Sequence, residues 1–305
     1  MIQLSAFSAM GLLSKFAGAE YSSSNIISSG EMEKRIIPST GEKIPVTGLG
    51  TWRTFDRGRF EAERAPLKDV LRMLVSKGAT VIDSSPMYGA SEGMVGDISS
   101  SLNIRSSTFL ATKVWTNGKE DGIEQMNESF RRMKTNVMDL MQVHNLVDVH
   151  THIKTLREWK EKGRIRYFGI THYVSSAYPE LMQLITSEKP DFVQFNYNIA
   201  DREAENRLLP FAKDKGIAVI INRPFREGAL FNGIEGKKLP AWANEYDIKN
   251  WAQFFLKFIL SHPAVTCTIP ATSKAWHLEE NLGAATGRLP GEKDRKKMAD
   301  YFLNL

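Results

Sequence analysis

The chain has little cysteine, no long apolar run after its N-terminus and no marked excess of charge of one sign. Its 305 residues include a single cysteine, Cys267, which excludes an internal disulfide. No later apolar run reaches the roughly 18 residues that a membrane span requires. The formal net charge is +5, from 40 Lys and Arg against 35 Asp and Glu spread along the chain. A diffuse excess of this kind does not indicate nucleic-acid binding, which a basic stripe would.

The amino-acid composition is typical of a globular protein. Hydrophobic residues make up 42% and charged residues 25% of the chain, which allows a sizeable buried core. The length fits either two domains or one α/β barrel, a fold that runs to about 250 residues or more as a single unit. Cys267 stands in the apolar segment VTCTIP, so we expect a buried thiol in a strand rather than a nucleophile.

The first thirty residues differ from the rest of the chain. Residues 2–14 are small and apolar, and Ala17 to Ala19 then form the A-x-A pattern that is typical of a signal-peptide cleavage site. The basic start of such a signal is missing. Residues 1–30 are therefore interpreted either as a truncated twin-arginine-type signal, with a periplasmic protein as its consequence, or as a disordered extension of a cytoplasmic one. The sequence leaves both open.

From about residue 35 the chain alternates short β-branched runs with amphipathic helical stretches. Two extended runs flank Ser39 to Gly41, a pattern typical of a hairpin. Strand-like runs follow at VTGLGTW, ATVIDSS, STFLATKVW, VMDLMQVHN, IRYFGIT, DFVQFNYN, GIAVIINRP and VTCTIPA. The helical spacing is clearest at Leu67, Val70, Leu71, Leu74 and Val75. Eight strands alternating with helices predict an α/β fold over residues 31–305, a (β/α)8 TIM barrel with an N-terminal β-hairpin.

A doubly wound open sheet is the competing architecture. No strand-like run is followed by G-x-G-x-x-G, so the dinucleotide fingerprint of that fold is missing. Residues 225–249 form a long polar stretch after the seventh run, and a loop in that position of a barrel lies on the catalytic face, over a ligand. A last short helix is expected at residues 291–303.

Four ionisable residues follow successive strand-like runs. Asp83 and Tyr88 come after the second run, Lys113 after the third and His144 after the fourth. An adjacent ammonium such as that of Lys113 favours a phenolate, which brings the pKa of a tyrosine from about 10 toward neutrality. Asp83 is expected to hold and neutralise the lysine, and His144 to orient a carbonyl oxygen. The set predicts protonation of a carbonyl oxygen while hydride arrives at its carbon.

These four residues stand in the contexts VIDSSPMYG, LATKVW and LMQVHN, which resemble the aldo-keto reductases, NAD(P)H-dependent oxidoreductases on a TIM barrel. The resemblance covers residues 35–290 and includes GLGTWR, GRIRYFGITHY, QFNYN and IPATSKAWHLEENLGA. It implies that Tyr88 is the general acid, that Lys113 and Asp83 tune it, and that His144 orients the substrate. It also implies reduction of an aldehyde or ketone, or the reverse oxidation of an alcohol.

The same resemblance implies which residues hold the cofactor. Thr171 and His172 take the place of a Ser-Asn pair that holds the carboxamide, and Gln194 matches a carboxamide-binding glutamine. Residues 277–281 match those around the adenosine. The full set expected along the cofactor is Thr51, Trp52, Asp83, Thr171, His172, Gln194, Asn222, Arg223, Pro224, Phe225, Gly228, Leu230, Ser273, Lys274, His277, Glu280 and Asn281.

One segment departs from the family pattern. Asn222-Arg223-Pro224-Phe225 stands where the family commonly has an aromatic residue followed by Ser-Pro-Leu, so the usual stacking surface for the nicotinamide is missing at Asn222. Arg223 brings a charge toward the cofactor phosphates or a substrate anion. Ser273 and Lys274 offer groups for the 2′-phosphate of NADPH, although a lysine lacks the bidentate fork of an arginine. NADPH is favoured, and NADH stays open.

Asp148, His150 and His152 have a spacing that mimics a metal site. They stand at the polar entry to the helical pattern THIKTLREWKEKG, so a helix cap at Asp148 or Thr151 is the preferred interpretation and no metal is expected.

Trp52, Trp115 and Phe225 either line an apolar substrate pocket or pack at the rim of the barrel.

Two functions from different classes follow. The intact quartet favours an NAD(P)H-dependent reductase of a small carbonyl compound. The substituted Asn222-Arg223 keeps open a regulatory or redox-sensing subunit that binds NADPH and turns over slowly, as the potassium-channel β subunits of the family illustrate. A monomer is expected, without a nucleic-acid partner or a membrane span.

Overall fold

Eight parallel strands form the centre of the computed structural model, which describes residues 30–58 and 60–305. Their order in the sheet is β10-β9-β8-β7-β6-β5-β4-β3, so each strand pairs with its neighbour in the sequence. Parallel bridges between Thr47 and Thr268 and between Gly50 and Ala271 join the two ends of the sheet and close the barrel. The strands are β3 (Leu49–Gly50), β4 (Val81–Asp83), β5 (Phe109–Val114), β6 (Met138–His144), β7 (Ile165–Thr171), β8 (Phe192–Asn196), β9 (Ala218–Asn222) and β10 (Cys267–Thr268). The predicted (β/α)8 barrel is confirmed.

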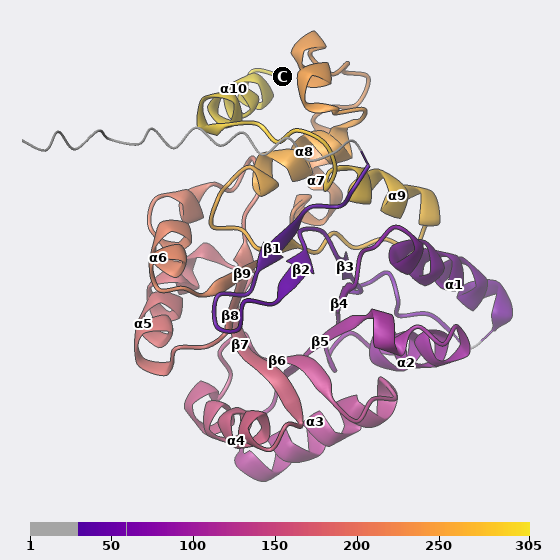
Figure 1. Ribbon diagram of the computed structural model, residues 1–305, viewed down its shortest axis with the longest axis vertical. Helices are drawn as coiled ribbons and strands as arrows, with labels where there is room; N and C mark the ends of the chain where they lie inside the picture. Colours follow the sequence, from indigo (N-terminus) through magenta and orange to yellow (C-terminus); the bar gives the residue numbers. More distant parts are fainter. Residues whose placement is uncertain (1–29, 59) are drawn as a thin grey trace, which may run out of the picture.

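Helices surround this ring of strands (Figure 1). The apolar side chains predicted for one face of the first helix include Leu67, Val70, Leu71 and Leu74, and all four are buried. The helices are α1 (Glu61–Ser76), α2 (Ser91–Ser101), α3 (Lys119–Arg132), α4 (Val149–Glu161), α5 (Tyr178–Glu188), α6 (Leu208–Asp214), α7 (Ala229–Asn232), α8 (Trp251–Leu260), α9 (Ala275–Gly283) and α10 (Glu292–Leu303). Short 3-10 helices are η1 (Arg105–Ser107), η2 (Ser175–Ala177), η3 (Glu203–Glu205), η4 (Arg226–Gly228) and η5 (Ala241–Tyr246). The last helix lies where it was expected.

The predicted hairpin plugs one end of the barrel. Strands β1 (Lys34–Ile36) and β2 (Lys43–Pro45) pair antiparallel and lie across the ring of strands in Figure 1. Ile37 and Ile44 pack in one apolar cluster with Phe109 and Phe192, the first residues of β5 and β8. The hairpin therefore covers the end of the barrel at which the strands begin, and the opposite end stays available for a ligand.

The alternation of side chains along each strand separates an apolar layer from a polar one inside the barrel. Side chains two residues apart point to the same face of a strand. In β6 the inward series is Leu140, Gln142 and His144, which runs from the apolar cluster to the open end. Cys267 belongs to the apolar layer, so the prediction of a buried thiol in a strand is confirmed, and burial raises the pKa of this thiol.

Two local predictions need correction. The stretch at residues 225–249 contains η4, α7 and η5 rather than an open loop. Asp148 does take the N-cap position of α4, but its side chain makes no capping bond and instead accepts from the backbone N–H of Gly118 at 2.8 Å. The interpretation of residues 1–30 as a signal or an extension lies outside the described residues, apart from Gly30. No helix in the described ranges has the length and apolar character needed to cross a membrane.

Candidate active site

A buried ion pair stands at the open end of the barrel. Lys113 on β5 is fully buried, and its Nζ donates to Asp83 Oδ1 at 2.5 Å and to the backbone oxygen of Ser84 at 2.7 Å. Burial by itself lowers the pKa of Lys113, but the charges of Asp83 and Tyr88 more than offset this, so the pKa is raised. The ammonium therefore stays charged although it is fully buried, and its pairing with Asp83 is the one that the sequence predicted.

Tyr88 lies in the turn that follows β4, held by a bond from its backbone N–H to the oxygen of Ser85 at 3.0 Å. Its ring centroid is 5.1 Å from Lys113 Nζ. Burial raises the pKa of Tyr88; Lys113 lowers it and Asp83 raises it, and the net direction is upward from 10.0. The expectation of a pKa near neutrality is therefore wrong for the protein alone, because desolvation outweighs the ammonium. The phenol is protonated, which is the state that a proton donor needs.

His144 ends β6 beside this tyrosine. The two rings meet edge to face, with centroids 5.9 Å apart. Burial first, and then the charges of Lys113 and His172, lower the pKa of His144 to about 2, so its imidazole is neutral. Its Nδ1 lies 3.0 Å from Ser85 Oγ. If Nδ1 accepts from this hydroxyl, the ring proton is on Nε2, and His144 presents one N–H donor.

Two side-chain amides, one from β6 and one from β8, hold the second oxygen of the Asp83 carboxylate. Its Oδ2 accepts from Gln142 Nε2 at 3.2 Å and from Gln194 Nε2 at 3.0 Å. Thr171 Oγ1 in turn donates to Gln194 Oε1 at 3.0 Å. The sequence reading missed Gln142 and Ser85. Gln142 was predictable, because it stands two residues before His144 on one strand and both side chains must face the barrel interior.

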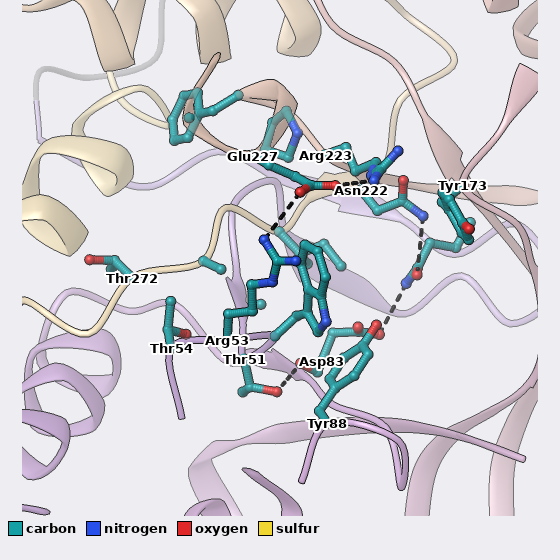
Figure 2. Close-up of a pocket in the computed structure, with 18 of the residues that line it drawn as sticks. Thr51, Arg53, Thr54, Asp83, Tyr88, Tyr173, Asn222, Arg223, Glu227 and Thr272 are labelled. Carbon is teal, nitrogen blue, oxygen red and sulfur yellow. Dashed lines mark hydrogen bonds and ion pairs between the residues drawn. The ribbon is translucent and has the colours of Figure 1, made fainter. Parts of the chain in front are cut away.

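A cavity of about 880 Å³ opens above these groups and extends to α9. Figure 2 shows Asp83 and Tyr88 on one side of it and the segment from Asn222 to Glu227 on the other. Trp52, Trp115 and Phe225 all line it, and Phe225 also packs against Phe231 and Phe255, so contact of these rings with a substrate stays a prediction. The wall includes these expected cofactor residues: Thr51, Trp52, Asp83, Thr171, Gln194, Asn222, Arg223, Pro224, Phe225, Gly228, His277, Glu280 and Asn281.

Four expected cofactor residues stand outside the cavity wall. The ring of His172 stacks on Tyr173, and its backbone oxygen accepts from Asn222 Nδ2 at 3.3 Å. Leu230 is buried in the core. Ser273 and Lys274 lie at the start of α9, where Lys274 Nζ is 5.6 Å from the ring centroid of the exposed Trp276. The structure therefore does not bring Lys274 into the cavity.

The wall residues fit a dinucleotide. One cavity is lined both by Asp83, at a strand end of the barrel, and by Asn281, on α9. Among residues 30–58 and 60–305, the buried Asn222 Oδ1 has no hydrogen-bond partner. An unpaired buried acceptor carries a desolvation cost that an amide N–H of a ligand removes. Thr171, Gln194 and Asn222 together offer hydroxyl and amide groups for a carboxamide.

The two histidines near α4 have different surroundings. His150 is exposed and pairs with Glu188, whereas His152 is buried with Nε2 2.7 Å from the backbone oxygen of Thr116. Within the part of the chain that the structure describes, no group of three or more His, Cys, Asp or Glu has the arrangement to hold a metal.

Comparisons with known proteins agree with this geometry. The model of the Aldo/keto reductase family matches residues 47–294. The chain is 27% identical to methylglyoxal reductase YeaE of Escherichia coli over 259 residues, 82% of this chain and 89% of that protein. It is 25% identical to the NADH-specific methylglyoxal reductase of the same organism, covering 90% and 95%. A crystal structure of an aldo/keto reductase from Klebsiella pneumoniae with NADP and acetate superposes with a TM-score of 0.71 at 24% identity, covering 92% and 96%, which supports the fold.

Proposed function

The chain belongs to the aldo/keto reductase family, and from this premise we propose that it reduces an aldehyde or ketone to the alcohol with NADPH, with Tyr88 as the proton donor. The observation that carries the proposal is the pairing of Lys113 with Asp83 beneath Tyr88 and next to His144, at the end of the barrel that the hairpin leaves free. NADH is the alternative cofactor.

The cofactor supplies the hydride, and the residues of this chain supply its position. Thr171, Gln194 and Asn222 would hold the carboxamide, and His277, Glu280 and Asn281 the adenosine. A Klebsiella relative is described as a complex with NADP and an Escherichia coli relative as NADH-specific, so both cofactors occur among similar proteins. We favour NADPH because two structures from Klebsiella pneumoniae that resemble this chain are described as complexes with NADP and with NADPH. Ser273 and Lys274, which precede α9, stand outside the cavity wall and add no support.

The residues of the quartet have separate roles in this mechanism. The Tyr88 hydroxyl gives its proton to the carbonyl oxygen as negative charge develops there. Lys113 stabilises the phenolate that remains, and Asp83 holds the ammonium in place. His144 is neutral, and with Nδ1 accepting from Ser85 Oγ its Nε2–H donates one hydrogen bond to the same oxygen. Preorganised donors of this kind stabilise the transition state without reorganisation during the reaction.

The test is oxidation of NADPH by the purified protein with a panel of small aldehydes and ketones, methylglyoxal included because two relatives carry that activity in their names. We expect turnover that depends on the carbonyl compound. Binding of NADPH is followed separately by quenching of tryptophan fluorescence. Tyr88→Phe retaining full turnover would contradict the mechanism, and absence of NADPH and NADH binding would contradict the function.

The second candidate function is a cofactor-binding sensor with slow turnover. The observation that favours it is Asn222 in place of a stacking aromatic residue, with Arg223 beside it on the cavity wall. Single-turnover oxidation of bound NADPH separates the two functions. Slow hydride transfer with tight retention of the oxidised cofactor supports the sensor, whereas fast transfer supports the enzyme.

We also propose that the protein acts as a monomer on a small molecule. Light scattering coupled to size-exclusion chromatography tests this, and a mass of twice 34.4 kDa would contradict it.

A further inference from the structure

Two arginines from distant parts of the chain share one carboxylate at the cavity wall. Arg53 follows β3 and Arg223 follows β9, and Glu227 lies between them in η4 (Figure 2). Arg53 Nη1 is 3.4 Å from Glu227 Oε2, and Arg223 Nη2 donates to Glu227 Oε1. All three side chains line the cavity. The carboxylate of Glu227 therefore bridges two guanidinium groups inside the site.

The side-chain charges around Glu227 on the cavity wall do not cancel. Asp83, another carboxylate of the wall, is neutralised by Lys113. Glu280 belongs to the adenosine end of the cavity, in α9. Two positive charges, on Arg53 and Arg223, thus face one negative charge, on Glu227. The side chains of Arg223 and Glu227 are about one third exposed, whereas that of Arg53 is 71% exposed. Arg223 is therefore the guanidinium that gains more from a further anion, because charges attract more strongly where water is partly excluded.

Aromatic rings hold both guanidinium groups in position. The Arg53 guanidinium carbon lies 4.1 Å from the ring centroid of Trp52, and that of Arg223 lies 4.6 Å from the ring centroid of Tyr173. Stacking on a ring face leaves the N–H edges of an arginine available for a planar, bidentate partner such as a carboxylate. The two arginines are therefore positioned before a ligand arrives.

Arg223 also lies within electrostatic reach of the proton donor. Its charge lowers the pKa of Tyr88, against the larger effect of burial, which raises it. Arg223, Tyr88 and His144 all line the same cavity. An anion held by Arg223 would therefore share that cavity with the proton donor.

We propose that Arg53 and Arg223 form an anion site for a carboxylate carried by the substrate, and that Glu227 occupies this site in the absence of ligand. The proposal rests on the reductase function and narrows its substrate class to aldehydes and ketones that carry a carboxylate near the carbonyl group. The carboxylate of the substrate displaces that of Glu227, so the exchange needs no net desolvation of an unpaired charge.

The experiment compares two aldehydes of similar shape that differ in charge, 4-carboxybenzaldehyde and its neutral amide 4-formylbenzamide, with NADPH as the donor. The ratio of their two kcat/KM values is compared between variants, so that any difference in intrinsic reactivity cancels, and the wild-type protein is expected to show the higher kcat/KM for the carboxylate. Arg223→Gln is expected to lower the ratio of the two kcat/KM values by roughly tenfold or more, since it removes a charge-assisted hydrogen bond. Glu227→Gln is expected to raise the ratio, because it removes the competing carboxylate.

Arg226→Gln is the matched control. This arginine stands in the same segment and the substitution removes the same charge, but its side chain pairs with Asp201 at 3.3 Å and does not line the cavity. The ratio is expected to stay at the wild-type value. An equal fall of the ratio in Arg223→Gln and Arg226→Gln would overturn the proposal, because general charge and not a site would then explain it.

The anion that Arg223 binds could belong to the substrate or to the cofactor. The dissociation constant of NADPH, measured by fluorescence for each variant, distinguishes these two sources. If Arg223→Gln weakens NADPH binding and lowers kcat/KM equally for both aldehydes, the anion is the diphosphate of the cofactor. That result overturns the proposal and leaves the reductase function standing. If the wild-type protein binds NADPH but reduces no carbonyl compound, the proposed function fails and the substrate class with it.

Discussion

Two tyrosines at opposite ends of the barrel show how the partner of a phenol decides its use. Tyr88 lies at the open end beside the Lys113 ammonium. Tyr167, in β7, lies at the hairpin end, where its hydroxyl donates to Glu42 at 2.5 Å and lies 2.8 Å from Thr40 Oγ1. Burial raises the pKa of both. At Tyr88 the ammonium opposes the effect of burial, whereas at Tyr167 the Glu42 carboxylate adds to it, and the pKa of Tyr167 reaches about 12.

The difference separates a structural hydroxyl from a chemical one. A phenol bonded to a carboxylate keeps its proton and fastens two segments, here the hairpin and β7. A phenol beside an ammonium is able to give its proton away, because the phenolate left behind is stabilised. The same residue type is therefore expected to tolerate substitution at one end of the barrel and not at the other.

The largest effect is expected from removing each hydroxyl in turn. Tyr88→Phe is expected to lower kcat by roughly 10²- to 10⁴-fold, the usual contribution of a general acid. Tyr167→Phe is the matched control and is expected to keep kcat, because its hydroxyl lies at the hairpin end. Steady-state kinetics with one aldehyde and saturating NADPH measure both. Equal losses in the two variants would break the comparison.

The next effect concerns the ammonium that distinguishes the two tyrosines. Lys113→Met leaves the Asp83 carboxylate buried without its cation, which is expected to cost about 3–5 kcal/mol in the free energy of unfolding. Urea denaturation measures this loss. The double variant Asp83→Asn, Lys113→Met is expected to be more stable than Lys113→Met alone, because no buried charge remains. A double variant that is less stable than the single one would contradict this account of the pair.

His144, beside Tyr88, is expected to make the free energy of unfolding depend on pH in the acid range. The pKa of His144 is about 2 in the folded protein and about 6.5 in an unfolded chain. Below pH 6.5 the unfolded chain binds a proton that the folded protein does not, so the free energy of unfolding falls as pH falls. His144 is expected to contribute about 1.4 kcal/mol per pH unit to this fall in the free energy of unfolding. In His144→Gln the free energy of unfolding is expected to fall less steeply between pH 6.5 and 4.5. The same dependence on pH in the wild-type protein and in the variant would contradict the burial argument.

A smaller effect is expected at the hairpin end. Tyr167→Phe removes the hydrogen bonds to Glu42 and Thr40 and is expected to lower the free energy of unfolding by about 1–2 kcal/mol. Glu42→Gln is expected to lower the pKa of Tyr167 from about 12, because it removes the carboxylate that favours the protonated phenol. Ultraviolet absorbance in an alkaline titration measures the shift, and Tyr167→Phe identifies the step that belongs to this residue. An unchanged titration in Glu42→Gln would contradict the assignment of cause.

Much of the architecture was predictable because it depends on local patterns. Each of the eight apolar runs contains one barrel strand, and the turn at residues 39–41 joins the two strands of the hairpin. The quartet was predictable as a set, since strand ends in a parallel barrel meet at one edge. Less was predictable inside residues 225–249, where polar composition indicated a loop and packing produced three short helices.

The site contains contacts that no local pattern carries. Arg53 and Glu227 are 174 positions apart, and neither spacing nor composition relates them. Lys274 matches a cofactor-binding position by its place in the chain, yet it lies against Trp276 outside the cavity wall. The contact between Arg53 and Glu227 depends on how the loops after β3 and β9 pack over the barrel. No short segment of the sequence predicts this packing.

Apolar periodicity and chain order were sufficient to predict the barrel, the hairpin and the four residues at the strand ends. The upward shift of the Tyr88 pKa, the bridge of Glu227 between two arginines and the place of Lys274 outside the cavity wall became visible only in the folded chain. A pKa and an ion pair depend on burial and on the distance between charges. Both quantities exist only after segments far apart in the chain have packed together.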